Sequence, residues 1–345
     1  MKIAVTERAM FKKCRRRWEY QFVRRLVPIQ EDYPALWIGI GVHDALENFY
    51  QGKPLLPALS EWWIKNITDA PTQVQLAPDT TWDLMSAMVL GYAKFAYNED
   101  QQWEILATEH KLRVPIPGTS GGVLSGRMDL LIRWNGKIWV VDHKTAASFV
   151  DEATLEFDDQ MTAYMWMVHE STGEAISGAV YNQLKKKIPE KPAVLQNGTL
   201  SKNKMQHTTP DLYREAIVEH NLNGADYIDI LGHFEKNNAF FRREYLTRNA
   251  MDIKTFVREL AVEYSMMVQA KAYPSVFCYR NLTRDCGWCP YHLLCKSESS
   301  EDTLQSQMLQ DALYMIREDP SGDSELNDLL APGPREDNPS GDGNK

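Results

Sequence analysis

The sequence has no long hydrophobic run, and this absence excludes a large class of proteins. No apolar stretch among the 345 residues approaches the 18 or more that a membrane-spanning helix needs. The apolar part of the first segment, MKIAVTERAMFKKC, is also too short for a secretory signal peptide. We therefore expect a cytoplasmic protein with no membrane partner.

Phosphate-loop and disulfide signatures are also missing. No G-x4-G-K-[ST] segment is present, which excludes an ATP-driven motor of the P-loop type. The chain has only five cysteines. In a cytoplasmic protein, so few thiols indicate metal or redox chemistry rather than a disulfide framework.

An excess of positive charge is missing too, since the formal net charge is −9. Residues 300–345 hold eleven Asp or Glu and three Lys or Arg, a net of −8, so residues 1–299 carry only −1. A nucleic-acid partner therefore stays open, and basic runs in the body are candidates for DNA binding, with solvated surface as the alternative. They contain Arg15, Arg16, Arg17, Lys185 and Lys186.

The chain is long enough for one large domain or two ordinary ones, and its 43% hydrophobic and 25% charged residues are typical of a globular protein. Apolar periodicity predicts alternating helices and strands, and this order favours an α/β (α+β) core. The predicted helices cover 4–25, 39–50, 55–101, 154–170, 211–233 and 249–270, and the predicted strands cover 104–115, 122–134, 137–145, 176–184 and 239–247.

Composition changes toward the C-terminal end of the chain. An amphipathic helix is predicted over 300–319, followed by an acidic tail over 320–345 in which PSGD occurs twice. A Pro-, Gly- and Asp-rich segment of this kind is typical of disorder. It could serve only for solubility, or it could bind a protein partner.

The segment GRMDLLIRWNGKIWVVDHKT, residues 126–145, reads as a β-hairpin around Asn135 and Gly136, a dipeptide suited to a two-residue turn with positive φ. In that register the numbers of paired residues sum to 271. Asp129 then lies directly opposite Asp142. Directly opposed carboxylates repel each other, so the hairpin contains an apparent conflict.

A divalent cation would turn this repulsion into coordination, because Mg²⁺ is commonly held by one or two carboxylates. Strand alternation keeps Lys144 on the same face as Asp142 and turns His143 to the other face. The alternative is a solvated face on which Lys144 partly neutralises the two carboxylates.

The segment CGWCPYHLLC places three cysteines in a C-x2-C-x5-C arrangement that indicates a metal site. Three thiolates leave both a tetrahedral Zn²⁺ site and a four-iron cluster one ligand short. Spacing alone does not separate zinc from iron–sulfur. The three cysteines are Cys286, Cys289 and Cys295, and candidates for the fourth ligand are Cys14, Cys278 and His292.

Taken together, these segments resemble the RecB-like branch of the PD-(D/E)XK nuclease superfamily. They are most similar to its iron–sulfur members, which include CRISPR-associated exonucleases, the AddB nuclease domain and phage relatives. The resemblance extends over residues 5–296. The matching positions are His43 in GVHDALE, Asp129 in GRMD, Asp142 and Lys144 in DHK, and Gln160 and Tyr164 in QMTAY.

The resemblance implies a restriction-endonuclease-like mixed sheet flanked by helices, with a nuclease domain over 1–299 and a helical insertion at about 52–101. It implies that Mg²⁺ or Mn²⁺ is held by His43, Asp129, Asp142 and the backbone carbonyl of His143. Lys144 would orient the attacking water or stabilise charge on the phosphate. Gln160 and Tyr164 would position the substrate or the lysine. Glu109 is a further acidic candidate outside this set.

The cysteines match the same family pattern, in which one cysteine near the N-terminus joins three near the C-terminus. Cys14 takes the first place, so the resemblance implies an iron–sulfur cluster of the 4Fe-4S type, with zinc as the alternative. Cys278 lies outside the pattern and is expected to be an ordinary thiol. The cluster region then comprises residues 278–295 together with Cys14.

The implied function is a metal-dependent DNA exonuclease acting on single-stranded DNA or DNA ends. It would work in recombination, repair or phage DNA processing, in the cytoplasm of a bacterium or of a phage-infected host. One alternative is a non-catalytic DNA-binding or scaffold subunit on a nuclease fold. The other is a structure-specific endonuclease.

Overall fold

The computed structural model describes residues 1–29, 34–300 and 302–317. Its contacts divide the chain into two compact units, which we describe separately. Unit 1 comprises Met1–Arg15 and Glu31–Asn281, and unit 2 comprises Arg16–Gln30 and Leu282–Lys345. The nuclease domain expected over 1–299 therefore spans parts of both units, and the acidic tail expected over 320–345 lies outside the described residues.

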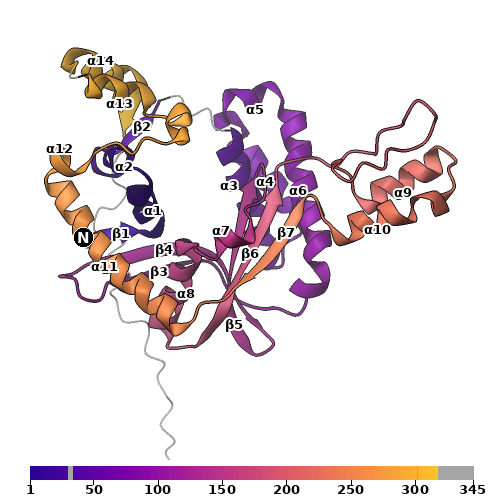
Figure 1. Cartoon of the computed structure of the whole chain (residues 1–345), viewed down its shortest axis with the longest axis horizontal. Coiled ribbons are helices and arrows are strands. Elements are labelled where there is room, and N and C mark those ends of the chain that lie inside the picture. The colour runs from indigo at the N-terminus through magenta and orange to yellow at the C-terminus, as the bar shows by residue number, and fades with distance from the viewer. Residues whose placement is uncertain (30–33, 301, 318–345) are drawn as a thin grey trace, which may run out of the picture. The chain divides into compact units, whose positions relative to one another are not determined.

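Unit 1 is built on a mixed six-stranded sheet (Figure 1). The strand order is β1-β4-β5-β6-β7, and β3 pairs with β4. Two of the pairs, β1 with β4 and β5 with β6, are parallel, and the others are antiparallel. The predicted α/β class is therefore confirmed. The strands are β1 (Lys2–Ala4), β3 (Glu104–Pro115), β4 (Val123–Trp134), β5 (Lys137–Ala146), β6 (Ile176–Lys185) and β7 (Phe241–Leu246).

The hairpin formed by β4 and β5 has the predicted turn. Asn135 and Gly136 have φ angles of 50° and 73°, and Trp134 pairs with Lys137. The pairing with β5 covers residues 130–134 of β4, whereas β1 pairs with residues 123–125. Residues 126–129 lie between these two segments, so Asp129 is placed just where β4 and β5 separate.

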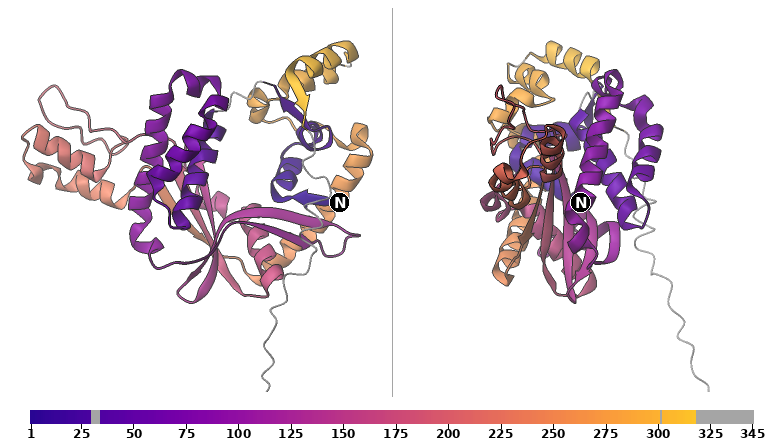
Figure 2. Two further views of the ribbon diagram at one scale, coloured as in Figure 1. Left: turned by 180° about the vertical axis from the view of Figure 1, so that it is seen from behind. Right: turned by 90° about the vertical axis from the view of Figure 1, so that its right-hand side faces the viewer.

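Three helices cover one face of the sheet: α3 (Pro34–Tyr50), α4 (Leu55–Asn66) and α6 (Pro78–Asp100). On α3, buried apolar residues recur at helical spacing, as Ile38, Val42, Ala45 and Leu46 show. This layer shares a buried core with residues at the ends of β6 and β7. It lies on the opposite side of the sheet from α8 and α11 (Figure 2, right).

The second face carries α8 (Asp159–Thr172), with α1 (Val5–Lys13) and α11 (Ala250–Ala272) packed on it. Helix α8 begins where the Asp158 carboxylate accepts a hydrogen bond from the Met161 backbone N–H, and it ends at Gly173 with φ 73°. Residues 161–168 of α8 are all buried. This central helix therefore fixes the positions of side chains on its sheet-facing turns.

An arm leaves the sheet between β6 and β7 and contains α9 (Pro210–Glu219) and α10 (Ile228–Lys236) (Figure 1). The single helical stretch predicted over 211–233 is wrong, because the short helix η3 (Gly224–Tyr227) interrupts it. Asn221 takes a positive φ of 50°, which breaks the helix before η3. The arm has a small apolar core of its own, which includes Tyr213, Tyr227 and Phe234.

Unit 2 contains two short antiparallel strands, β2 (Leu26–Pro28) and β8 (Tyr314–Ile316), with α13 (His292–Ser299) and α14 (Thr303–Leu313). The helix predicted over 300–319 is therefore too long, since the chain forms β8 after Leu313. The buried Tyr314 ring stacks on Tyr291 with ring centroids 5.4 Å apart, and this contact favours the strand.

Several short helices complete the described part of the chain. They are α2 (Arg15–Trp18), the π-helix η1 (Glu19–Val23), η2 (Ile67–Asp69), α5 (Thr72–Leu76), α7 (Glu152–Leu155), α12 (Pro274–Phe277) and η4 (Arg284–Trp288). Among the described residues, no helix combines the length and the apolar character that a membrane span requires.

Candidate active site

A cluster of acidic side chains and one histidine lies where β4 and β5 separate. His43 on α3, Glu109 on β3 and Asp129 on β4 each offer a ligand atom, and these atoms lie within 4.8 Å of one another. This spacing is close to that of ligands around one cation at about 2.0–2.2 Å. The imidazole and carboxylate donors suit a divalent ion such as Mn²⁺ or Mg²⁺.

Glu109 reaches the cluster through an unusual backbone conformation. Its φ is 46°, although it is not a glycine and lies within β3. The pairs Thr108 with Leu130 and His110 with Met128 place residue 109 opposite residue 129. Strain of this kind, about 1–3 kcal/mol, is typical of functional sites. No motif in the sequence signals this bend, so Glu109 stood outside the predicted ligand set.

Asp142 and Lys144 lie on the same strand, β5, and form an ion pair of 2.7 Å between Oδ2 and Nζ. The predicted register places Asp142 opposite Asp129, but the pairing of β4 with β5 ends one residue earlier, at Leu130 and Val141. Beyond that point, the Asp129 Oδ2 accepts a hydrogen bond of 2.6 Å from the His143 backbone N–H. The two strands are therefore joined at the site through a carboxylate.

His43 and Asp129 each shift the pKa of the other toward the charged form. Burial raises the pKa of Asp129, but the hydrogen bond and charge of His43 outweigh it and bring this pKa below its usual range. Burial lowers the pKa of His43, yet Asp129 raises it overall, and their Nδ1 and Oδ2 atoms lie 3.5 Å apart. Asp129 is thus held ionised, as a metal ligand has to be.

The carboxylates of Glu109 and Asp142 are repelled by the charge of Asp129. Burial, and then the charge of Asp129, raise the pKa of Glu109 to about 7, even though Arg127 lies 2.7 Å from it. Burial and the charge of Asp129 also raise the pKa of Asp142, against the effect of Lys144. A bound cation would relieve both effects, so the electrostatics of the cluster favour a positively charged ligand.

Lys144 keeps its proton at neutral pH. Burial lowers its pKa, but the neighbouring Asp142 raises it above the ordinary lysine value. A side chain of this kind can donate hydrogen bonds and stabilise negative charge, but it cannot act as a general base near pH 7.

Gln160 and Tyr164 lie one turn apart on α8 and are hydrogen-bonded, with 3.0 Å between the Gln160 Nε2 and the Tyr164 hydroxyl. The Tyr164 ring packs closely over Gly126, where an added Cβ would come within 2.8 Å of it. This contact gives a physical reason for a glycine three residues before Asp129. Burial raises the pKa of Tyr164 to about 12, so its hydroxyl stays protonated.

The His143 side chain lies on the other side of β5, as strand alternation predicts. Its ring stacks on Tyr50 at 5.7 Å and meets the edge of Tyr92 at 5.3 Å. Its Nδ1 lies 3.3 Å from the Asn182 Nδ2. Burial lowers the pKa of His143 to about 3, so the ring is neutral.

Arg243 on β7 completes a buried polar network behind His143. Its guanidinium donates to Asn182 Oδ1 at 2.7 Å and to the Tyr92 hydroxyl at 2.9 Å. It also pairs with Glu99 at 2.7 Å and with Asp100 at 2.8 Å. The strand that carries Asp142 and Lys144 is therefore supported from behind by a buried polar network, in which the His143 Nε2 and Asp100 Oδ1 atoms have no hydrogen-bond partner among the described residues.

Of the predicted basic residues, Lys185, Lys186 and Arg15 belong to unit 1. Lys186 donates to the Thr145 carbonyl at 2.9 Å, next to Lys144, and Lys185 lies 3.1 Å from a ring nitrogen of His207. Arg15 stacks on the rings of Phe11 and Tyr279 in unit 1, and Arg16 and Arg17 belong to unit 2, where Arg16 pairs with Glu19 and Glu298.

The cysteines are divided between the units. Cys14 ends α1 in unit 1, whereas Cys286, Cys289 and Cys295 lie in unit 2. Cys289 and Cys295 pack against the small aromatic core of that unit. Cys278 in unit 1 is buried, and its Sγ lies 3.7 Å from the Ala270 carbonyl oxygen.

Comparisons with known proteins give one family and several solved structures, two of which are described below. The family model of the PD-(D/E)XK nuclease superfamily matches residues 2–296. The crystal structure of SSO0001 has 14% identity and a TM-score of 0.35, with 86% of both chains covered. The "Putative exonuclease" of Eubacterium rectale has 14% identity and a TM-score of 0.32, covering 65% of this chain and 84% of its own. No curated protein matches the sequence.

Proposed function

Because this chain belongs to the PD-(D/E)XK nuclease superfamily, we propose that it is a metal-dependent DNA exonuclease. Its substrate would be single-stranded DNA or DNA ends. It would act in recombination, repair or phage DNA processing, in the cytoplasm of a bacterium or of a phage-infected host. The observation that carries the proposal is the convergence of His43, Glu109 and Asp129 beside the Asp142–Lys144 ion pair.

The donor set fits Mg²⁺ or Mn²⁺. His43, Asp129 and Asp142 would hold the ion together with the His143 backbone carbonyl, and Glu109 is a further ligand candidate. The imidazole favours Mn²⁺ over Mg²⁺. When bound, such an ion polarises a phosphate oxygen and lowers the pKa of a water molecule.

Lys144 would stabilise the negative charge that develops on the scissile phosphate. Its raised pKa keeps the ammonium protonated, and Asp142 holds it 2.7 Å away in a fixed place. Preorganised donors of this kind contribute about 10²–10³-fold to kcat. Gln160 and Tyr164, hydrogen-bonded to each other on α8, would position the lysine or the substrate.

The decisive experiment compares the wild type with Lys144→Ala and with Lys65→Ala, an exposed lysine on α4. Anaerobically purified protein is incubated with end-labelled linear and circular single-stranded DNA, with Mn²⁺, Mg²⁺ or EDTA. We expect metal-dependent loss of label from linear DNA only, reduced at least about 10²-fold by Lys144→Ala and unchanged by Lys65→Ala.

Other results would replace the proposal. Cleavage of circles would indicate an endonuclease, since only an endonuclease cuts DNA without an end. Tight DNA binding that needs no metal and leads to no cleavage would indicate a DNA-binding or scaffold subunit.

We further propose that Cys14, Cys286, Cys289 and Cys295 hold a 4Fe-4S cluster with a structural role, with zinc as the alternative metal. Unit 2 has only a small aromatic core, and units of this size usually need a metal or another staple to fold. Loss of the metal would then unfold unit 2 rather than change the chemistry.

Iron, sulfide and zinc analysis of anaerobically purified protein identifies the metal. We expect Cys286→Ser to lose it and to melt at a lower temperature, whereas Cys278→Ser should keep it. A Cys286→Ser protein with native melting behaviour and full metal content would contradict the cluster.

DNA would approach over basic side chains, for which Arg15, Arg16, Arg17, Lys185 and Lys186 remain the candidates. Lys185 is the last residue of β6 and pairs with Ala146 at the end of β5, and Lys186 follows it. This position supports a contact of both lysines with DNA that leaves the cluster. The acidic tail could bind a protein partner, and deleting residues 320–345 without loss of partner capture would remove that role.

A further inference from the structure

The end of strand β5 that carries Lys144 continues into a row of side chains on the neighbouring strands. Lys144 pairs with Gln183 on β6, and Gln183 pairs with Arg242 on β7. Side chains of paired residues lie on the same face of a sheet, so Arg242 shares the face of Lys144. Lys185 follows Gln183 by two residues on β6 and points to this face as well. Two strand spacings, about 10 Å in all, separate Lys144 from Arg242.

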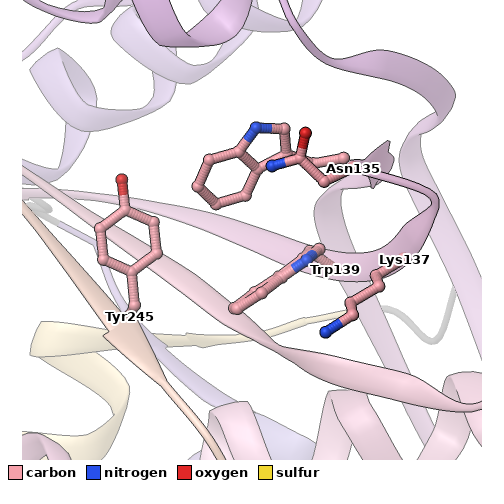
Figure 3. A pocket seen from close by; sticks show the side chains of 5 residues that line it. Asn135, Lys137, Trp139 and Tyr245 are labelled. Carbon is pink, nitrogen blue, oxygen red and sulfur yellow. The ribbon is translucent and has the colours of Figure 1, made fainter.

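The opposite face of the sheet offers no such continuation. Strand alternation places His143 there, together with an aromatic pocket at the turn of the β4–β5 hairpin (Figure 3). The pocket has a volume of 360 Å³ and is lined by Trp134, Asn135, Lys137, Trp139 and Tyr245. It therefore faces away from Asp142 and Lys144, whereas Arg242 and Lys185 lie on the face of these two residues.

An aromatic ring lies against both cations. Phe149 belongs to the loop between β5 and α7, and its ring centroid lies 5.0 Å from the Arg242 guanidinium carbon and 5.9 Å from the Lys185 Nζ. The loop is fixed to the sheet by the buried Gln183 side chain. This amide accepts a hydrogen bond of 2.6 Å from the Val150 N–H and donates one of 3.1 Å to the Val150 carbonyl. The ring is thus held in place and limits the positions that the two cations can take.

The charges of these two cations are only weakly neutralised. Arg242 lies 3.8 Å from Glu244, which is beyond hydrogen-bond distance, and its side chain is 45% exposed. Lys185 lies 3.1 Å from a ring nitrogen of His207, and no carboxylate of the described residues pairs with it. Three cations of the neighbouring arm, in contrast, have close carboxylate partners, in the pairs Lys187–Glu190, Lys191–Glu219 and Arg214–Glu235.

An anion with repeated charges fits this row of cations. Lys144 faces the scissile phosphate in the proposed function, and the two further cations lie on the same face about 10 Å away. Duplex DNA advances about 3.4 Å per step along each strand, so about three steps cover this length. A single phosphate or carboxylate would reach only one end of the row, whereas a DNA strand would reach both.

We propose that Lys185 and Arg242 form a second phosphate subsite, which binds the DNA strand about three steps from the scissile phosphate. Phe149 is the positioning residue of this subsite, because it holds the two cations beside each other. The inference rests on the proposed function and extends it from the cluster along the strand.

The test measures binding of a fluorescein-labelled oligothymidylate to the full-length protein in EDTA, by anisotropy from about 50 to about 200 mM salt. Arg242→Met and Lys185→Met should each weaken binding about 5- to 10-fold at the lowest salt. Each should also make the slope of log K against log salt shallower by about 0.7, the value for one phosphate contact. Lys191→Met, which removes an exposed lysine that pairs with Glu219, is the matched control and should change neither quantity.

Two variants of the ring separate positioning from charge. Phe149→Leu keeps both cations but frees them, so affinity should fall about 2- to 10-fold while the salt slope stays that of the wild type. Phe149→Tyr keeps the ring and should keep the wild-type affinity. A Phe149→Leu protein that binds like the wild type would show that the ring does not position the cations.

The subsite proposal fails alone if the wild type binds and degrades DNA while Arg242→Met and Lys185→Met behave like Lys191→Met. An equal change of slope in Lys191→Met would indicate a general effect of net charge and would also overturn the subsite. If the wild type neither binds nor cleaves DNA, the proposed function fails first and this inference with it.

Discussion

The two faces of strand β5 differ in how their carboxylates are paired. On one side, Asp142 lies near Glu109 and Asp129, and repulsion among these carboxylates raises the pKa of Asp142 and Glu109 beyond the effect of burial. On the other side, the neutral His143 ring rests on a network centred on Arg243. There the carboxylates of Asp100 and Glu99 both have a guanidinium partner within 2.8 Å.

The face with the unbalanced carboxylates is suited to bind a ligand, whereas the face with the Arg243 network supports the backbone of β5. The carboxylates of the network are paired within the protein, since Arg243 contacts both of them and the Tyr50 hydroxyl donates to Asp100 at 2.6 Å. On the acidic side, Lys144 and Arg127 balance the carboxylates only in part, so a bound cation would add stability. His143 links the two sides, because its ring belongs to the network while its backbone N–H donates to Asp129.

The largest effect should follow from breaking the network. Arg243→Met leaves Asp100 and Glu99 without their cation, and removing one partner of a buried pair costs about 3–5 kcal/mol. Urea unfolding measures this loss. Arg242→Met on the same strand removes an exposed guanidinium and should cost less than about 0.5 kcal/mol.

If the two variants lose equal stability, the network is not a special support for β5. A loss for Arg243→Met that stays below about 1 kcal/mol would lead to the same conclusion, since buried pairs cost more than that to break.

Local patterns in the sequence were enough to predict much of the sheet. The strands near 104–115, 122–134, 137–145 and 176–184 have clear β periodicity, and the Asn135-Gly136 turn follows from the two residues themselves. The three-residue strands β1, β2 and β8 were missed. Each is too short to show a period, and each pairs with a segment far away in the chain.

The site was predictable where its residues belong to a motif or to the hairpin. Asp129, Asp142 and Lys144 followed from the hairpin pattern, whereas His43 was identified only through a family resemblance. Glu109 was not among the predicted ligands, because its place depends on a positive φ and on the register of β3 against β4.

The supporting network was beyond prediction for a similar reason. Isolated polar residues such as Asn182 and Arg243 have no local pattern, and only the pairing of β6 with β7 brings them together.

Glu109→Gln should have a smaller effect than Arg243→Met. It should raise the stability of the metal-free protein and lower its affinity for Mn²⁺. Removing this charge relieves repulsion with Asp129, so the metal-free protein should become more stable at pH 8, where Glu109 is ionised. At the same time its affinity for Mn²⁺, measured by calorimetry, should fall about 10- to 100-fold.

Glu104→Gln, an exposed change on the same strand, is the control and should alter neither quantity by much. Unchanged Mn²⁺ affinity in Glu109→Gln would show that Glu109 is not a ligand, whatever its effect on stability.

The smallest effect should come from the pH dependence of the network itself. Burial raises the pKa of Asp100, although Arg243 opposes it. In the unfolded chain this carboxyl releases its proton near pH 3.9, whereas in the folded protein it does so at higher pH. The folded state therefore binds more protons in this window, and stability falls as pH rises through it.

Asp100→Asn removes the titrating carboxyl while keeping the shape of the side chain. Relative to the wild type, the variant should thus be least stable below about pH 4 and should recover as the pH is raised toward 7. Chemical unfolding at several pH values measures the difference, with Asp226→Asn on the exposed arm as the control. If the difference is independent of pH, Asp100 is ionised as easily in the folded protein as in the unfolded chain, and Arg243 then balances the cost of its burial completely.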